Sequence, residues 1–486
     1  MIDTLRQAPG TPPARAGGGW RLATYAWALL AALGLTYFIW RAPFQVSDFI
    51  GNLLVVRHES FLDLFRQYGT RGPYFRPFVW AFFKVVFDLA HGHYAFAYKL
   101  TQVIQVSMLF LLFARLLGVR TWNHFAAVPF GFAVLIGMHT FGGFLFELYP
   151  VNVQLTVAVL TLAAFDVAES RGGWWADVLA SGILAVAMLC FELGLLVWVV
   201  IVAARLAGAR GVSRKGVAAC SVVFVAYFAI RYFLMGVHAP GVAERSSGYL
   251  FRVLEPGELQ ALFGAHLGRF YAYNILCSFS SVLFAEPRAG VWRFVAEVVR
   301  HDEIPEWMLI NLVTSTLTTL AIIVFSLRCV RRWLRLRVTP EERPVVVFWA
   351  VALANAVISF PYTKDQIIGP AGCFYALAAY FVARSMVLAQ PRLGLAARGF
   401  VVAVLLVLSC GWTVRSMGLV YNLHDAAYRH RNEWLTVDDW LRGQGLNLEQ
   451  ADRDFVRGFQ REMLAMPVPP PYFVYGRWGS RFADQN

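Results

Sequence analysis

The stretch LATYAWALLAALGLTYFIW, residues 22–40, follows Arg21 and contains no charged residue. Its length matches the roughly 20 apolar residues that an α-helix needs to cross a lipid bilayer. The run is longer than the apolar centre of a signal peptide, and no clear small-x-small cleavage site accompanies it, so we expect an uncleaved membrane anchor. Residues 1–21 are polar and contain APGTPPARAGGG, which predicts a disordered cytoplasmic lead.

Apolar runs of similar length recur along the rest of the chain. The longer run 175–206 holds Glu192 near its middle. Because a carboxylate at mid-bilayer costs about 2.5–3.5 kcal/mol or more, we expect two short helices that meet at Glu192. The sequence therefore predicts an all-α, polytopic integral membrane protein with about eleven transmembrane helices between residues 22 and 417. The remaining predicted spans are 95–118, 124–144, 151–168, 216–236, 306–331, 345–361, 366–389 and 399–417.

The composition agrees with a membrane protein. Hydrophobic residues make up 58% of the 486 residues and charged residues 15%, whereas a soluble domain has about 25% charged residues. The same numbers exclude intrinsic disorder, a collagen-like fibre and a disulfide scaffold. The six cysteines form no CxxC pair, so no zinc site or redox motif is predicted. Only four of the 43 basic residues are lysines, a bias typical of GC-rich genomes, and we expect a bacterial inner-membrane protein.

The arginines predict the orientation. Most lie in short loops between apolar runs, which favours contact with anionic lipid on the cytoplasmic side over nucleic-acid binding. With a cytoplasmic N-terminus and eleven spans, the four arginine-rich loops all fall on the cytoplasmic side. The opposite, periplasmic side then holds the loop 41–94 with an interfacial helix near 77–90, the stretch 237–305, and a C-terminal tail, 418–486. The arginine-rich loops are those near 118, 210, 335 and 392.

Asp48 directly follows the first span. A carboxylate held at the membrane surface is partly dehydrated yet reaches polar substrates, as a general base must to take a proton from an acceptor hydroxyl. The alternative is that Asp48 caps the next helix.

The loop after Asp48 carries Arg66, Arg71 and Arg76. Arginines on the periplasmic side run against the positive-inside trend. Binding a phosphate or pyrophosphate of a membrane-held substrate would explain them, and so would contact with lipid headgroups. His58 and Glu59 in the same loop are further site candidates, but they have no metal-ligand spacing with another pair.

Two acids lie in otherwise apolar surroundings, Glu147 in FLFELYPVNVQL and Glu192 in AMLCFELGLL. Such residues usually face the bundle interior or a wet cavity, so each is a site candidate, with a hydrogen-bonded structural acid as the alternative. Lys364 and Asp365 lie in a turn between two predicted spans. Lys364 either pairs with Asp365 or holds a phosphate.

The order of these segments resembles the GT-C superfamily of polytopic glycosyltransferases, which use polyprenyl-phosphate-linked sugars. The matching segments are Asp48 after the first span, FRPF at 75–78, HYAFAYKLTQ at 93–102, FELG at 191–194, PYTKDQIIGPAG at 361–372 and RHRNEWLTVDDW at 429–440. The chain departs from the family pattern at two places. Ser47 precedes a single Asp48 where many relatives have paired acids, so the use of a divalent metal stays an open question. Phe191 stands in place of the lysine of a Lys-Glu pair.

The resemblance implies transfer of a glycosyl unit from a polyprenyl-phosphate donor to an acceptor hydroxyl on the periplasmic face. It makes Asp48 the base and assigns the donor phosphate to Arg66, Arg71, Arg76 and Lys364. The acceptor is a lipid, a glycan or a protein, and no cofactor is certain. Two alternatives stay open. One is a polymerase or ligase of lipid-linked polysaccharide, which uses a pyrophosphate-linked chain. The other is a lipid or solute transporter, a class in which internal repeats are common, whereas none is evident here.

Overall fold

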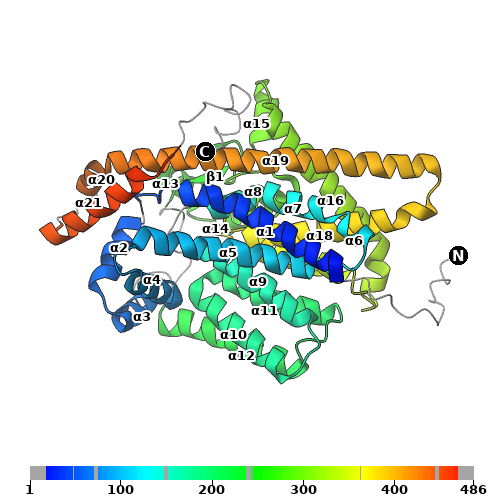
Figure 1. The fold of residues 1–486 in the computed structure, drawn as a ribbon, viewed down its shortest axis with the longest axis horizontal. Coiled ribbons are helices and arrows are strands. Elements are labelled where there is room, and N and C mark those ends of the chain that lie inside the picture. Colours follow the sequence, from blue (N-terminus) through cyan, green and yellow to red (C-terminus); the bar gives the residue numbers. More distant parts are fainter. Residues whose placement is uncertain are drawn as a thin grey trace.

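The computed structural model describes residues 18–47, 49–70, 75–146, 152–236, 242, 245–361, 363–443 and 448–468. These residues form an all-α structure with one short hairpin (Figure 1). Six helices are long and apolar enough to cross a membrane: α1 (Gly18–Arg41), α5 (Tyr94–Leu116), α12 with its π-helical end η2 (Arg214–Leu234), α16 (Glu306–Trp333), α18 with η3 (Gly369–Arg392) and α19 (Leu395–Leu435). The all-α prediction is confirmed, and the long apolar helices indicate a multi-pass membrane protein.

A seventh candidate span is bent. Helices α6 (Trp122–Phe125) and α7 (Val128–Gly137) are followed by α8 (His139–Phe146), which turns by 62°. Met138 interrupts the helix with extended backbone. The other predicted spans form shorter helices, α9 (Val153–Glu169), α10 (Trp174–Cys190), α11 (Leu195–Leu206) and α17 (Arg343–Ile358). The count of eleven spans therefore stays a prediction.

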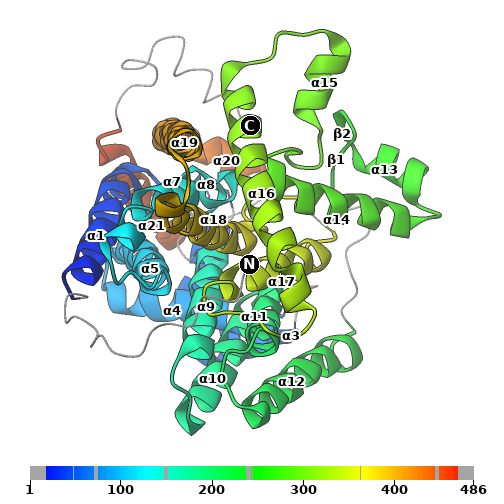
Figure 2. The ribbon, with the colours of Figure 1, turned by 90° about the vertical axis from the view of Figure 1, so that its right-hand side faces the viewer.

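Helix α18 lies at the centre of the bundle. Figure 2 shows it surrounded by α7, α9, α16 and α17, all of which contact it. Every side chain from Gly369 to Arg384 is buried. A helix that is apolar on all sides belongs in a core, and the small residues of GPAGCFYALAA allow close approach. A Cβ on Gly369 would lie 2.0 Å from the ring of Phe144.

The predicted break at Glu192 is present. Helix α10 ends at Cys190, a 3₁₀ turn η1 spans Glu192–Gly194, and α11 begins at Leu195. Gly194 makes this turn sterically feasible, because a Cβ there would lie 2.2 Å from the carbonyl of Ala187. The two short helices therefore meet at a polar residue, as the cost of a mid-bilayer carboxylate requires.

The loop 41–94 contains three helices, α2 (Phe49–His58), α3 (Phe61–Thr70) and α4 (Pro77–Ala90). Helix α4 has the bounds expected for the interfacial helix. The stretch after α12 forms a two-stranded antiparallel hairpin, β1 (Ser247–Tyr249) and β2 (Arg252–Leu254), which the sequence patterns did not predict. Helices α13 (Pro256–Phe263), α14 (Leu267–Phe284) and α15 (Arg293–Arg300) follow.

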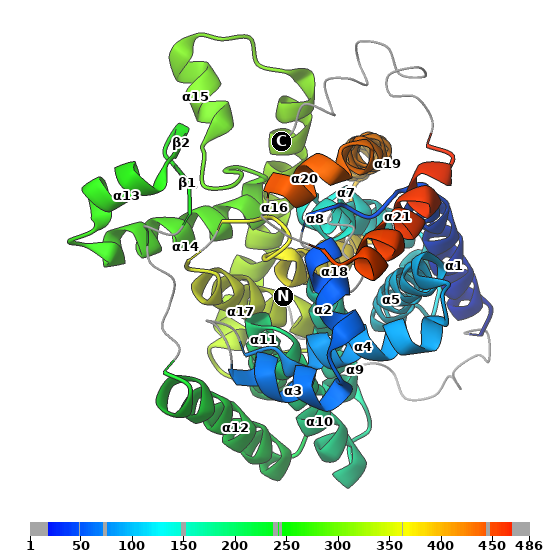
Figure 3. The ribbon, with the colours of Figure 1, turned by 90° about the vertical axis from the view of Figure 1, so that its left-hand side faces the viewer.

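The last long helix, α19, runs through residue 417 without a break and carries the beginning of the predicted tail. Helices α20 (Val437–Gly443) and α21 (Gln450–Ala465) then fold back. Figure 1 shows α2, α3, α4, α20 and α21 toward one end of the molecule, and that end faces the viewer in Figure 3. A separate apolar cluster that includes Phe44, Phe49, Trp434 and Phe459 joins the first-loop and tail segments there.

Candidate functional site

An ion pair between Arg76 and Glu192 joins two segments that lie 116 residues apart. The guanidinium donates from Nε and Nη2 to Glu192 Oε2 at 3.2 and 2.7 Å. The same guanidinium lies over the ring of Phe191, 4.2 Å from its centroid. The FRPF and FELG segments of the sequence therefore meet in space.

The chain before α4 sets the position of Arg76. Pro77 occupies the first turn of α4, where its missing N–H costs nothing. A residue that precedes proline is disfavoured in the helical region, and Arg76 has φ −134° and ψ 52°. The backbone at Arg76 is therefore non-helical, immediately before the first helical turn.

A second guanidinium, that of Arg231 in η2, completes this cluster. Its Nη1 lies 3.3 Å from Glu192 Oε1 and donates to Tyr227 Oη at 3.1 Å. The side chains of Arg76, Glu192 and Arg231 are 27%, 17% and 12% exposed. One carboxylate thus joins two guanidiniums at a partly accessible position. Such a cluster can attract an anionic group.

Asp365 belongs to a different cluster. Its carboxylate lies 3.8 Å from Arg288 Nε and 3.8 Å from His139 Nε2. The His139 ring also shares a 2.8 Å hydrogen bond with the hydroxyl of Ser281. Burial lowers the pKa of Arg288, and the nearby Asp365 opposes this effect. Lys364 is exposed and forms no ion pair within the part of the chain that the structure describes. Of the two alternatives for Lys364, the pair with Asp365 is absent among the described residues, and Asp365 lies beside Arg288 and His139 instead.

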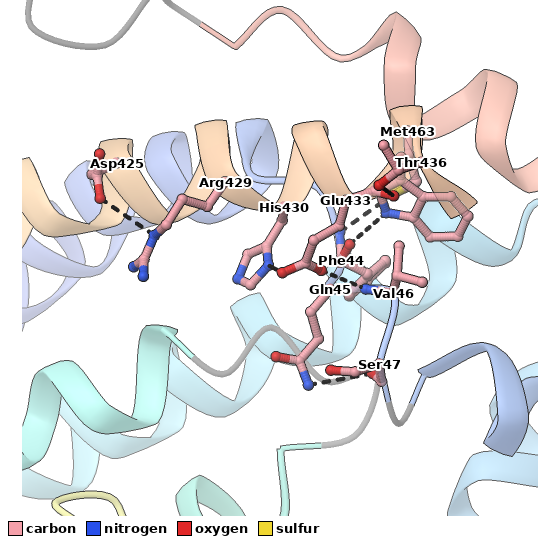
Figure 4. A network of polar contacts seen from close by, with 11 residues as sticks. Phe44, Gln45, Val46, Ser47, Asp425, Arg429, His430, Glu433, Thr436 and Met463 are labelled. Atoms are coloured by element: carbon pink, nitrogen blue, oxygen red, sulfur yellow. Dashed lines mark hydrogen bonds and ion pairs between the residues drawn. The ribbon is translucent and has the colours of Figure 1, made fainter. Parts of the chain in front are cut away.

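Phe44 and Val46, which precede Asp48, form hydrogen bonds with side chains at the end of α19 (Figure 4). The N–H of Val46 donates to Glu433 Oε2 at 2.8 Å, and His430 lies 3.2 Å from the other carboxylate oxygen. Trp434 Nε1 donates to the carbonyl of Phe44 at 2.6 Å. The tail thus fixes the chain that leaves the first span.

The remaining predicted residues are distributed as follows. Asp48, Arg71 and Glu147 lie outside the described residues. Arg66 is exposed on α3, and Glu59 is partly buried at the end of α2.

His58 contacts the tail rather than an open site. Its Nε2 lies 2.9 Å from Asp452 Oδ1, and Arg57 Nη1 lies 2.9 Å from the same oxygen. Both partners of Asp452 come from α2, so this cluster joins α2 to α21.

Lys99 was not predicted as a site residue. It is fully buried in α5, and its Nζ donates to the carbonyls of Ile39, at 2.9 Å, and Ala42. The ammonium also lies 4.3 Å from the centroid of Phe44. It therefore caps the carboxyl end of α1, where a cation is favoured. The sequence contains the feature that could have identified Lys99, because a lysine inside an otherwise apolar run needs a buried partner.

Among the described residues, no group of three or more His, Cys, Asp or Glu side chains is arranged to hold a metal ion. Comparison of the chain with protein-family models, with curated proteins and with solved structures finds no match.

Proposed function

We propose that this protein is a membrane glycosyltransferase of the GT-C type, with Asp48 as the base and the arginines of the first loop as ligands of the donor phosphate. The observation that carries the proposal is the contact between the FRPF and FELG segments at Arg76 and Glu192. Two partly exposed guanidiniums suit a leaving phosphate, because fixed cations stabilise the developing anion.

The ion pairs of Glu192 and Asp365 change the roles expected of these two acids. Glu192 accepts two hydrogen bonds from Arg76 and faces Arg231, so its carboxylate is engaged in holding cations. Asp365 is likewise paired with Arg288. Both acids therefore suit a positioning role, and Asp48 is the proposed proton acceptor, with Glu59 and Glu147 as the other acidic candidates.

The proposal includes a topology with eleven spans, a cytoplasmic N-terminus and a periplasmic C-terminus in the bacterial inner membrane. Support comes from the first-loop helices and the tail helices lying toward one end of the molecule (Figure 1, Figure 3). The test is labelling with a membrane-impermeant thiol reagent in intact cells, on a chain whose exposed Cys410 is replaced by serine. A cysteine in place of Arg431 should react and one in place of Arg335 should not. The reverse pattern would contradict the topology.

Mass spectrometry of lipid that copurifies with the protein tests the donor. We expect a polyprenyl phosphate or its sugar adduct. A pyrophosphate-linked glycan would instead favour the polymerase or ligase alternative, and transport of a lipid across proteoliposomes without any transfer would favour a transporter.

Turnover is then measured with the sugar adduct identified in this way. Asp48→Asn should lose about 10²–10⁴-fold in rate while still binding donor, and Arg76→Ala should raise the donor Michaelis constant roughly tenfold or more. Arg398→Gln, an exposed position on α19, is the matched control and should match the wild-type protein. Near-normal turnover of Asp48→Asn would refute the base assignment.

A further inference from the structure

A small cavity lies beside the bend between α7 and α8. Helices α16 and α19 and the loop between α14 and α15 form its other walls. Its volume of about 40 Å³ is enough for roughly three water molecules. It is lined by Ile136, Gly137, Met138, His139, Gly142, Arg288, Asn311, Arg415, Gly418, Leu419 and Asn422.

Arg415, on the wall of this cavity, lies in α19 and is 5% exposed. Its Nη1 donates to the carbonyl of Asn311 at 3.1 Å and to the hydroxyls of Thr314 and Ser315 at 2.9 and 2.7 Å. Within the part of the chain that the structure describes, its Nε and Nη2 have no hydrogen-bond partner. One edge of a buried guanidinium is thus left without an acceptor.

No carboxylate offsets this charge among the described residues. Arginine keeps its proton in proteins, and a buried charge without a counterion costs several kcal/mol. The plane of Arg415 also lies over Trp412, 3.9 Å from the ring centroid. That contact and the two hydroxyls stabilise the cation in part, but neither uses the Nε–Nη2 edge.

The second guanidinium on the cavity wall belongs to Arg288, whose ion partner Asp365 lies 3.8 Å away and also faces His139. Arg288 therefore has an acid beside it, whereas Arg415 has none among the described residues. The Arg76 cluster differs, because Glu192 lies between its two guanidiniums. Arg415 is therefore a buried cation of the cavity wall without a carboxylate partner among the described residues.

We infer that this cavity binds a single tetrahedral oxyanion of the phosphate class. The free Nε–Nη2 edge of Arg415 forms the fork that binds two oxygens of a phosphate at once. Arg288 supplies a second positive charge, and the amides of Asn311 and Asn422 supply further donors. The cavity has room for one phosphoryl group. The bound group is either inorganic phosphate or the headgroup of a phosphorylated lipid.

This inference goes beyond the proposed glycosyl transfer, since it concerns a different set of residues and is tested by binding alone. The probe is sodium phosphate added to full-length protein in detergent, with sodium chloride at equal ionic strength as reference. A parallel series compares undecaprenyl phosphate with undecaprenol. The readout is the melting temperature as a function of ligand concentration.

We expect saturable stabilisation of the wild-type protein and of the exposed control Arg398→Gln. Arg415→Gln should weaken the apparent affinity roughly tenfold or more, as loss of a charge-assisted contact predicts. Stabilisation by inorganic phosphate that Arg415→Gln weakens identifies a free-phosphate site, whereas stabilisation by undecaprenyl phosphate alone, again weakened by Arg415→Gln, identifies a lipid headgroup. A response to undecaprenyl phosphate that Arg415→Gln leaves unchanged belongs to the proposed donor site at Arg76 and would overturn the inference.

Asn422→Leu keeps both arginines and fills the cavity, so it tests the inference if Arg415→Gln fails to fold. The filled variant should fold and lose the response to the ligand. Absence of any response to either ligand in the wild-type protein would overturn the inference, and so would an unchanged response in the folded variants.

Discussion

Replacement of Glu192 by glutamine removes the one negative charge between Arg76 and Arg231. In the wild-type protein Glu192 accepts two hydrogen bonds from Arg76, and its other oxygen lies 3.3 Å from Arg231. Breaking a buried ion pair costs about 3–5 kcal/mol because an uncompensated charge remains. The three side chains are 12–27% exposed, and glutamine keeps one acceptor. We therefore expect the free energy of unfolding to fall by less than that range, by about 2–3 kcal/mol.

The assay is thermal unfolding in detergent, followed by the fluorescence of the tryptophans. One kcal/mol shifts the melting temperature of a domain of 150–250 residues by about 2–4 °C, and less in a longer chain, so Glu192→Gln should melt about 3–6 °C lower. Arg76→Gln should also destabilise. The double variant should lose less than the sum of the two single variants, since residues in contact do not add.

The control is the exposed pair between Arg252 and Glu258, whose side chains are 65% and 41% exposed. Exposed pairs contribute about 0–1 kcal/mol, so Glu258→Gln should change the melting temperature little. Equal melting temperatures for Glu192→Gln and Glu258→Gln would refute the reasoning. Additive effects of Arg76→Gln and Glu192→Gln would refute it as well.

Three further outcomes are expected. Burial raises the pKa of Glu286 to about 7, from 4.5. Between pH 4.5 and pH 7 the folded protein therefore keeps a proton on Glu286 that the unfolded chain has lost. Stability then falls as the pH rises, so the melting temperature should decrease from pH 5 to pH 7, and Glu286→Gln should remove this decrease. Gly194→Ala should sharply reduce the yield of folded protein, because its Cβ meets backbone at 2.2 Å, whereas Gly182→Ala, with open space around it, should not. Trp434→Phe loses the 2.6 Å hydrogen bond to Phe44 and should speed amide exchange in residues 42–47; unchanged exchange would contradict the role given to the tail.

The sequence by itself indicated the long apolar helices and the break at Glu192, but not the bend at Met138 or the β1–β2 hairpin. Long uncharged runs such as 22–40 predict helices in a bilayer, since the backbone must satisfy its own hydrogen bonds there. The break at Glu192 followed from the cost of a carboxylate in an apolar run. The bounds of α4, Pro77–Ala90, were predictable as well, because Pro77 marks the first turn of a helix.

The contacts of the candidate site depended on the tertiary structure. Arg76 meets Glu192, and Asp365 turns to Arg288 rather than to its neighbour Lys364. Helices that are apolar on every side carry little information about which faces meet, because lipid and protein interiors are similarly apolar. The partner of a polar residue inside such a helix, such as Arg415, is therefore decided by packing between segments far apart in the chain.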